Sequence, residues 1–203
     1  QPHECIQRLR TLAGSIVQGN TDAWLLEPKT GHAQDERAQR LEDLGLWCRQ
    51  QLDEDDLGFL RTFRPTFTQV LAEDASILCY HGSPHGYHDV ILPTTADEEL
   101  VRLLDGFSAT VMAGGHTHLP MVRQHHTTIL INPGSVGLPM IRSPQGDWRP
   151  SWAEYALINW QPNCLGIELR RVPIDLQKLG QIVQEVHMPH AEGWLADWRF
   201  VPF

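Results

Sequence analysis

The amino-acid sequence predicts an α/β fold with two stacked sheets, and two patterns in the chain support this class. Helical and strand patterns interleave in the first half of the chain, whereas predicted strands follow one another in the second half. The 203 residues are enough for one domain with a substantial hydrophobic core. We therefore predict a single domain over residues 1–203.

The first half of the chain is predicted to alternate helices and strands. Apolar residues at helical spacing predict a helix over residues 3–13, and a short strand over 15–20 leads into a glycine turn. Residues 34–63 predict two helices, and Asp53 lies where it can cap the second. A strand, a turn and another strand follow over 66–82.

The second half is predicted to be richer in strands. The segment 95–107 predicts a helix that Thr95 or Asp97 caps. The remaining predicted elements are a strand over 109–114, a hairpin over 121–132 that turns near residues 124–126, an antiparallel pair over 153–160 and 164–174, and a last helix capped by Asp175. The aromatic residues of 192–200 are expected to pack against the body of the domain.

The composition excludes several classes of function. The formal net charge is −9 and no block of Lys and Arg occurs, so we expect no nucleic-acid surface. No apolar run approaches the ~18 residues that a membrane helix requires, so we expect no membrane partner. Four cysteines are scattered without a C-x-x-C pair, which indicates reduced thiols in a cytoplasmic protein. Whether the chain forms a homo-oligomer stays open.

Three predicted strands end in a glycine next to a side chain that can bind a metal. The segments are "SIVQGNTD" with Asn20, "SILCYHGSP" with His81, and "TVMAGGHTH" with His116 and His118. Loops that follow strands meet at one edge of a sheet, and residues two apart in an extended chain point the same way. Because imidazole nitrogen binds zinc, iron, manganese and nickel, these segments predict a metal site.

Four motifs together resemble a known family. G-N-T-D, H-G-S-P, G-G-H-T-H and I-N-P-G-S-V-G-L-P, in that order, resemble motifs of the calcineurin-like metallophosphoesterases. The resemblance implies a four-layer α-β-β-α sandwich of two mixed sheets and a small phosphoester, either a monoester or a diester, as the substrate. It also implies a centre of two divalent ions (Mn, Fe, Zn or Ni) whose bound hydroxide attacks phosphorus.

The resemblance also implies roles for individual residues. Asn20, His81 and His116 match catalytic ligands of one ion, and His118 matches a ligand of the other. The predicted substrate contacts are Arg142, His85 and Asn132.

Two departures from the family pattern change these expectations. The opening D-x-H and G-D motifs, whose aspartate bridges both ions, are absent before G-N-T-D, so we expect a chain that lacks its first strand-helix-strand unit. The four matched ligands are neutral and compensate the charge of two ions poorly, so we expect at most one ion in this chain and no activity from it alone. Thr21 stands where many members have a histidine, and a hydroxyl is a poor general acid near neutral pH.

Other interpretations of these residues remain open at this stage. Asp22 and Asp89 are candidate carboxylate ligands, although Asp22 is also placed to cap a helix. The chain as a whole is alternatively a non-catalytic binding or regulatory module with the same fold, or an H-x-H metal amidohydrolase of another fold. The N-P-G-S-V-G segment after G-H-T-H argues against the amidohydrolase.

Overall fold

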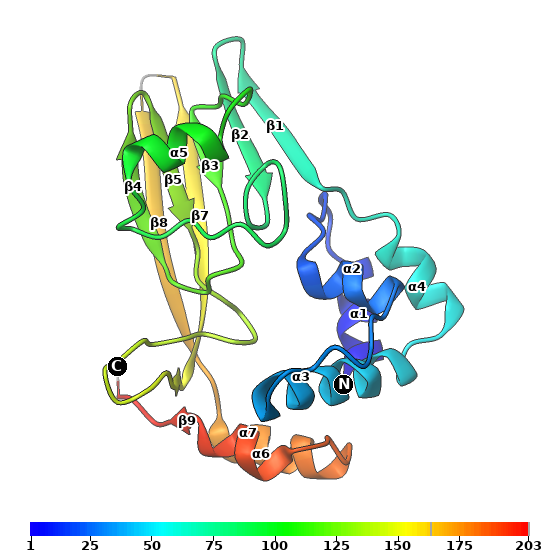
Figure 1. Ribbon diagram of the computed structural model, residues 1–203. Coiled ribbons are helices and arrows are strands. Elements are labelled where there is room, and N and C mark those ends of the chain that lie inside the picture. Colours follow the sequence, from blue (N-terminus) through cyan, green and yellow to red (C-terminus); the bar gives the residue numbers. More distant parts are fainter. Residues whose placement is uncertain (163, 203) are drawn as a thin grey trace.

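The computed structural model describes residues 1–162 and 164–202 (Figure 1). The helices are α1 (Pro2–Arg10), α2 (Asn20–Leu26), α3 (Glu36–Gln50), α4 (Glu54–Leu60), α5 (Asp97–Leu103), α6 (Leu176–Glu185) and α7 (Ala191–Ala196). The strands are β1 (Thr66–Ala72), β2 (Ala75–Tyr80), β3 (Val111–Ala113), β4 (Met121–His125), β5 (Thr128–Asn132), β6 (Arg149–Pro150), β7 (Trp152–Gln161), β8 (Cys164–Pro173) and β9 (Trp198–Arg199).

A five-stranded mixed sheet, in the order β1-β2-β3-β5-β4, forms the centre of the fold. Its inner strands β2, β3 and β5 run parallel, with Ile77, Val111 and Ile129 in register across them. The outer strands β1 and β4 are antiparallel to their neighbours. This mixed sheet with its flanking helices confirms the predicted α/β class.

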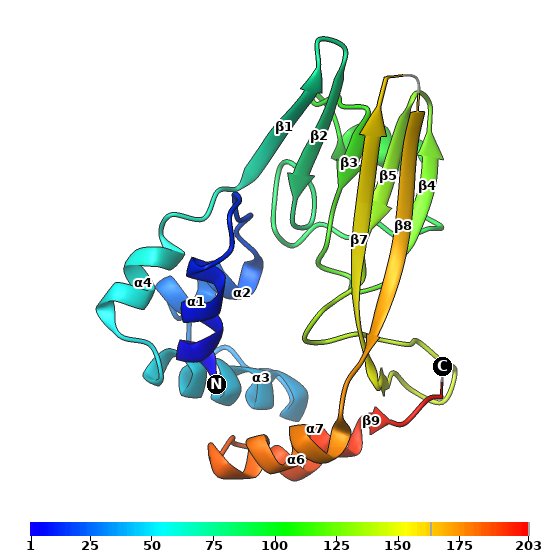
Figure 2. The ribbon, with the colours of Figure 1, turned by 180° about the vertical axis from the view of Figure 1, so that it is seen from behind.

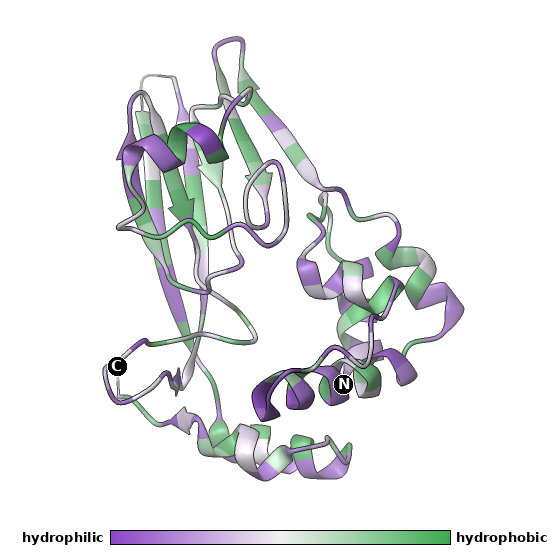
Figure 3. Cartoon of the chain, viewed as in Figure 1, coloured by the Kyte–Doolittle hydropathy of each residue, from purple (hydrophilic) through white to green (hydrophobic). Residues whose placement is uncertain are grey.

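A long antiparallel hairpin, β7 paired with β8, forms the second sheet. Figures 1 and 2 show α5 on one face of the central sheet and the β7–β8 hairpin on the opposite face. The side chains alternate accordingly. Met112 of β3 and Leu130 of β5 join the core beneath α5, whereas their neighbours along each strand, Val111 and Ile131, point to the other face. All four are at most 2% exposed, so the sheet is buried on both sides at β3 and β5. These inner strands are largely green, and therefore hydrophobic, in Figure 3.

Helices α1, α2 and α4 pack around a second hydrophobic core beside the lower end of β1 (Figures 1 and 2). Leu57 and Leu60 of α4 are 1% exposed, and Ile6, Leu25 and Phe63 complete this core. The predicted break near Asp53 is confirmed, because its carboxylate accepts a hydrogen bond from the N–H of Asp56 and caps α4.

Two predicted elements differ in the structure. The expected strand over 15–20 is a single isolated bridge between Val17 and Arg64, because α2 begins at Asn20 and leaves no length for a ladder. Neither Thr95 nor Asp97 caps α5. The Thr95 hydroxyl accepts from the N–H of Leu92, and Asp97 pairs with Arg123 at 2.6 Å, so both side chains serve other contacts.

The strand-rich end follows the sequence prediction closely. The hairpin β4–β5 turns at His126, whose φ is 50°. The Asp175 carboxylate accepts from the N–H of Lys178 at 3.0 Å and caps α6. Trp198 is 9% exposed and its ring centroid lies 5.3 Å from that of Trp194, so these two residues pack inward as predicted, whereas Phe200 is 77% exposed and does not. Within the described part of the chain, no helix combines the length and apolar character needed to cross a membrane.

The cap of α6 gives a test of how strongly local contacts support the fold. Replacing Asp175 by alanine leaves the first-turn N–H of Lys178 without its acceptor and should lower the free energy of unfolding by about 1 kcal/mol. Denaturation with urea measures this change. Gln184→Ala on the exposed side of the same helix is the control and should change stability by less than about 0.5 kcal/mol. Equal effects of the two substitutions would refute the capping role.

Candidate metal centre

The parallel strands of the central sheet place candidate ligands at one edge. β2 ends at Tyr80 and His81 follows at once. β3 ends at Ala113, and the N–H of Gly115 donates to the carbonyl oxygen of His81 at 2.7 Å, which joins the two loops. β5 ends next to them at Asn132. The strand ends therefore converge, as expected for the carboxyl edge of parallel strands.

Asn20, His81 and His116 form a compact cluster at this edge. Asn20 is the first residue of α2, and its Oδ1 lies 2.8 Å from Nε2 of His81. Nδ1 of His116 lies 3.3 Å from the same nitrogen, with the two ring centroids 5.1 Å apart. Gly19 permits the approach of α2, because a Cβ there would lie 3.0 Å from Cε1 of His81. The structure thus brings together the three residues predicted to hold one ion.

His116 and His118 reach the cluster through a left-handed backbone. Their φ angles are 60° and 56°, and β3 has already ended at Ala113. The expectation that an extended chain aims both rings is therefore wrong, because the turn and not the strand sets their direction. Non-glycine residues in this conformation persist where surrounding contacts hold them, and such residues concentrate at functional sites.

Asn132 supplies contacts that hold this turn. Its side chain is 2% exposed, and its Nδ2 donates to the carbonyl oxygen of Gly115 at 2.7 Å and to the Thr117 hydroxyl at 3.0 Å. Its Oδ1 accepts from the N–H of Gly134 at 2.9 Å. The amide thus ties the histidine turn to the N-P-G loop, and these bonds leave it little capacity to contact a substrate.

The histidines of the cluster favour the neutral form. Burial and the neighbouring histidines lower the pKa of His81 to about 4. Burial also lowers the pKa of His116 and of His118. A neutral imidazole has a free lone pair on one nitrogen, so the neutral form is the one that binds a metal ion.

An unsatisfied nitrogen supports the assignment of His118 to the same region. Its Nδ1 is buried and finds no hydrogen-bond partner among the described residues. His118 follows His116 by two residues in the same left-handed turn. A buried nitrogen without a partner is costly unless a ligand completes it. The donor set of one amide oxygen and imidazole nitrogens therefore fits a borderline divalent ion.

The two candidate carboxylates have other partners. Asp22 accepts from the N–H of Gly19, the residue before α2, at 2.7 Å, while burial raises the pKa of its carboxyl group. Asp89 accepts a hydrogen bond from the Ser83 hydroxyl. The sequence predicted Asp22 as the cap of a helix that begins after it, but α2 begins earlier, at Asn20, so Asp22 lies in the first turn and its side chain bonds back to Gly19. The negative charge of Asp89 acts to raise the pKa of His116, against the lowering by burial.

The remaining predicted substrate residues lie around this cluster to different extents. Nε2 of His85 lies 2.9 Å from the carbonyl oxygen of Asp105, and its ring packs on Phe107, which directs it toward the end of α5. Arg142 is exposed between Ile141 and Trp148. No contact in the structure joins either residue to the cluster, and their substrate contacts stay predictions.

His88 lies nearer to the cluster than either of these residues. Its ring centroid is 6.2 Å from that of His116, and the side chain is exposed. The H-G-S-P motif indicated only His81, because the loop that folds His88 back depends on the contact between Ser83 and Asp89. His88 is therefore a further neighbour of the cluster.

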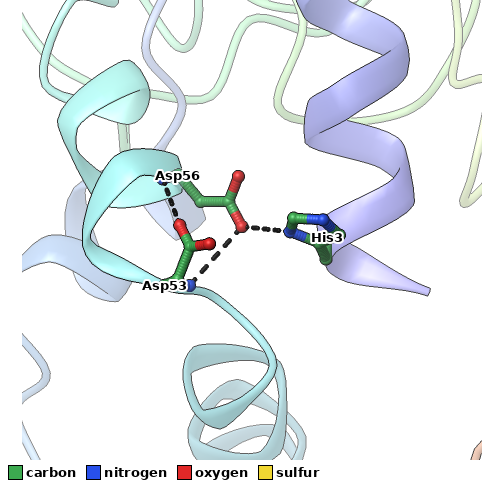
Figure 4. A group of neighbouring side chains, drawn as sticks. All are labelled: His3, Asp53 and Asp56. Atoms are coloured by element: carbon green, nitrogen blue, oxygen red, sulfur yellow. Dashed lines mark hydrogen bonds and ion pairs between the residues drawn. The ribbon is translucent and has the colours of Figure 1, made fainter.

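A second group with metal-binding side chains lies between α1 and α4. His3, Asp53 and Asp56 place ligand atoms within 4.8 Å of one another (Figure 4). Asp56 is fully buried, with one oxygen 2.6 Å from Nδ1 of His3 and the other accepting from Gln7 at 3.1 Å. Arg10 approaches to 3.8 Å and adds positive charge. Protein donors already satisfy this carboxylate, so its hydrogen bonds to His3 and Gln7 hold α1 against α4. We call this contact the brace between the helices.

This brace predicts a pH dependence of stability. The hydrogen bond to Asp56 raises the pKa of His3 above its ordinary value of 6.5. The protonated imidazole therefore stabilises the fold at pH values below 6.5, and this contribution is lost as the pH rises through the raised pKa. Between pH 5.5 and pH 9, the melting temperature should fall more for the wild type than for His3→Gln. His126→Gln, in the exposed hairpin turn, should retain the wild-type slope, and identical slopes for all three proteins would contradict the brace.

The α/β fold thus places neutral nitrogen and oxygen donors at one edge of its sheet, an arrangement suited to a divalent metal ion. The chain belongs to the calcineurin-like phosphoesterase superfamily, because the model of the Calcineurin-like phosphoesterase superfamily domain matches residues 2–149. The resemblance seen in the sequence motifs is thereby confirmed.

Two solved structures resemble the whole chain. A metallophosphoesterase from Sphaerobacter thermophilus is 22% identical with a TM-score of 0.67, over 97% of this chain and 82% of that one. A hypothetical protein from Pyrococcus horikoshii OT3 is 18% identical with a TM-score of 0.70, over 92% of this chain and 74% of that one. No curated protein sequence matches the chain. At these identities, the similarity establishes the shared fold.

Proposed function

We propose that this protein hydrolyses a small phosphoester, either a monoester or a diester, with Asn20, His81 and His116 holding a divalent ion and His118 available to a second. The observation that carries this proposal is the convergence of the Asn20 oxygen and the His116 nitrogen on Nε2 of His81, at 2.8 and 3.3 Å. Manganese, iron, zinc and nickel all suit such donors. A bound ion would polarise a phosphoryl oxygen and stabilise the charge that develops on it.

The residues of this chain contribute position and charge state. Burial keeps His81 neutral, so its lone pair is available for a ligand at neutral pH. Asn132 holds the turn that carries His116, and α2 brings Asn20 to the cluster through its first residue. Cys5, Cys48, Cys79 and Cys164 are all free, which supports location in the reducing cytoplasm.

The neutral donors limit how many ions this chain holds. Asp22 and Asp89 accept hydrogen bonds within the fold, so neither of these two candidate carboxylates is left free to offset the charge of a pair of ions. We infer that the 203 residues bind at most one ion, and elemental analysis of the purified chain after dialysis against manganese measures the number. Two ions per chain would show that Asp89 or another carboxylate of this chain completes the site.

Turnover tests the function itself. The full-length gene product, loaded with manganese, should hydrolyse bis(p-nitrophenyl) phosphate or p-nitrophenyl phosphate, and a chelator should abolish the reaction. A protein that binds manganese yet hydrolyses neither ester would instead favour the non-catalytic binding module. Failure to bind any divalent ion would overturn the proposal.

A further inference from the structure

A cavity of about 1010 Å³ opens directly beside the histidine cluster. Asn20, Thr21 and His88 form part of its wall, so the cavity is continuous with the candidate metal centre. Ligand pockets commonly have volumes of ~300–1,000 Å³, and a bare phosphate group fills a small part of such a space. The volume beside the cluster therefore has room for a much larger part of a substrate.

Beyond Asn20, Thr21 and His88, much of the cavity wall is apolar. Its apolar side chains include Trp24, Leu44, Trp47, Leu138, Met188 and Trp194. Along its 15 residues, α3 has no buried residue, although it carries Leu41, Leu44, Leu46 and Trp47. Leu41, which also borders the cavity, is 63% exposed. Leu44 and Trp47 are half-buried, so the part of α3 that lines the cavity still leaves apolar surface for a ligand.

The shape of the wall depends on one close contact between α2 and α3. A Cβ at Gly45 would lie 2.5 Å from Cζ3 of Trp24, so only glycine allows the indole to lie flat against α3. Glycine inside a helix costs about 0.5–1 kcal/mol relative to alanine, and this close approach offers a physical reason for it. The contact sets how far Trp24 projects into the cavity.

The opposite wall comes from the C-terminal segment. Nε2 of His190 lies 2.7 Å from the Asp43 carboxylate of α3 and holds the start of α7 beside that helix. Met188 and Trp194, on either side of His190, thereby close the cavity from a third direction. The same lining includes Glu27, Glu42 and Lys29, whose charges do not favour a second anionic group.

We propose that this cavity binds an uncharged aromatic or other bulky apolar group of the phosphoester while the phosphate lies at the histidine cluster. This inference rests on the proposed function and adds the class of substrate. An uncharged apolar group matches the Trp- and Leu-lined wall, and a phosphate matches the polar end at Asn20 and His88.

Binding measurements test this inference without turnover. In the manganese-loaded 203-residue chain, 2-naphthyl phosphate should bind at least about tenfold more tightly than methyl phosphate in isothermal titration calorimetry, a difference of about 1.4 kcal/mol. Leu44→Gln and Gly45→Leu should bring the two affinities close to each other. The first substitution makes the wall polar, and the second displaces Trp24. Val101→Gln on the exposed side of α5 is the matched control and should keep the wild-type ratio.

The outcomes separate this inference from the function on which it rests. If the wild type bound 2-naphthyl phosphate and methyl phosphate equally well, and His116→Ala bound neither, the proposed role of the cavity would be wrong but the phosphate site would stand. Binding of 2-naphthol as tight as that of 2-naphthyl phosphate, unchanged in His116→Ala, would show that no phosphate site exists. A dimer that Leu44→Gln converts into a monomer would assign the cavity to a second copy of the chain and would also overturn the proposal.

Discussion

Replacing His116 by alanine should reduce the affinity of the chain for manganese or zinc by at least about 100-fold. Loss of a residue that only orients a metal ligand already costs 10- to 100-fold in affinity, and we propose His116 as a ligand itself. Its Nδ1 lies 3.3 Å from Nε2 of His81, so its removal takes one of three converging donors from the cluster. Isothermal titration with the metal chloride measures the affinity, and turnover of the full-length gene product should fall in parallel.

His126→Ala is a closely matched control for this change. Both histidines have a left-handed backbone, with φ values of 60° and 50°, so alanine meets similar backbone strain at the two positions. His126 lies in the β4–β5 turn, away from the strand ends that carry the cluster. We expect its substitution to leave metal affinity and turnover near the wild-type values. Comparable losses from the two substitutions would mean that the cluster has been assigned wrongly.

Asn132→Leu should lower the free energy of unfolding by about 2–5 kcal/mol. The substitution removes the partner of the Gly115 carbonyl, the Thr117 hydroxyl and the Gly134 N–H, and each buried polar group without a partner costs about 1–3 kcal/mol. Urea denaturation measures the loss of stability. Metal affinity should fall as well, because the turn that carries His116 loses its brace.

Two further variants make this prediction specific. Asn132→Asp keeps an acceptor for the N–H of Gly134 but loses the donor to Gly115, so we expect it to be destabilised even though its shape is almost unchanged. Asn159→Leu, at an exposed position of β7, should change stability by less than about 0.5 kcal/mol. If Asn132→Leu were as stable as the wild type, the bracing role would have to be abandoned.

Contacts between residues close in sequence account for most of the correct predictions about the fold. Asp53 and Asp175 cap α4 and α6 through N–H groups three residues later, and the β4–β5 hairpin turns where the sequence indicates. Such interactions depend on short-range geometry that a pattern of residues encodes directly. Thr95 and Asp97 show the limit of this reasoning. Asp97 forms an ion pair with Arg123, which lies in β4, a strand distant in sequence.

For the candidate site too, the sequence predicted some features and only the tertiary structure showed the others. The strand endings and the glycine-rich motifs identified Asn20, His81, His116 and His118 from the sequence alone, since residue type and order carry that signal. Which of these atoms meet could be learned only from the tertiary structure. The left-handed turn at His116 and the three hydrogen bonds of Asn132 depend on loops that follow separate strands.

The sequence by itself determined the α/β class, the order of most elements and the residue types able to bind a metal, because periodicity and motifs are local properties of the chain. Only the tertiary structure decided that Asp22 and Asp89 have partners within the fold, and that Val17 forms an isolated bridge with Arg64. It also decided that Trp24 lies on Gly45 to shape a cavity beside the histidines. These features arise from side chains that approach one another only after distant segments pack, so no pattern along the chain specifies them.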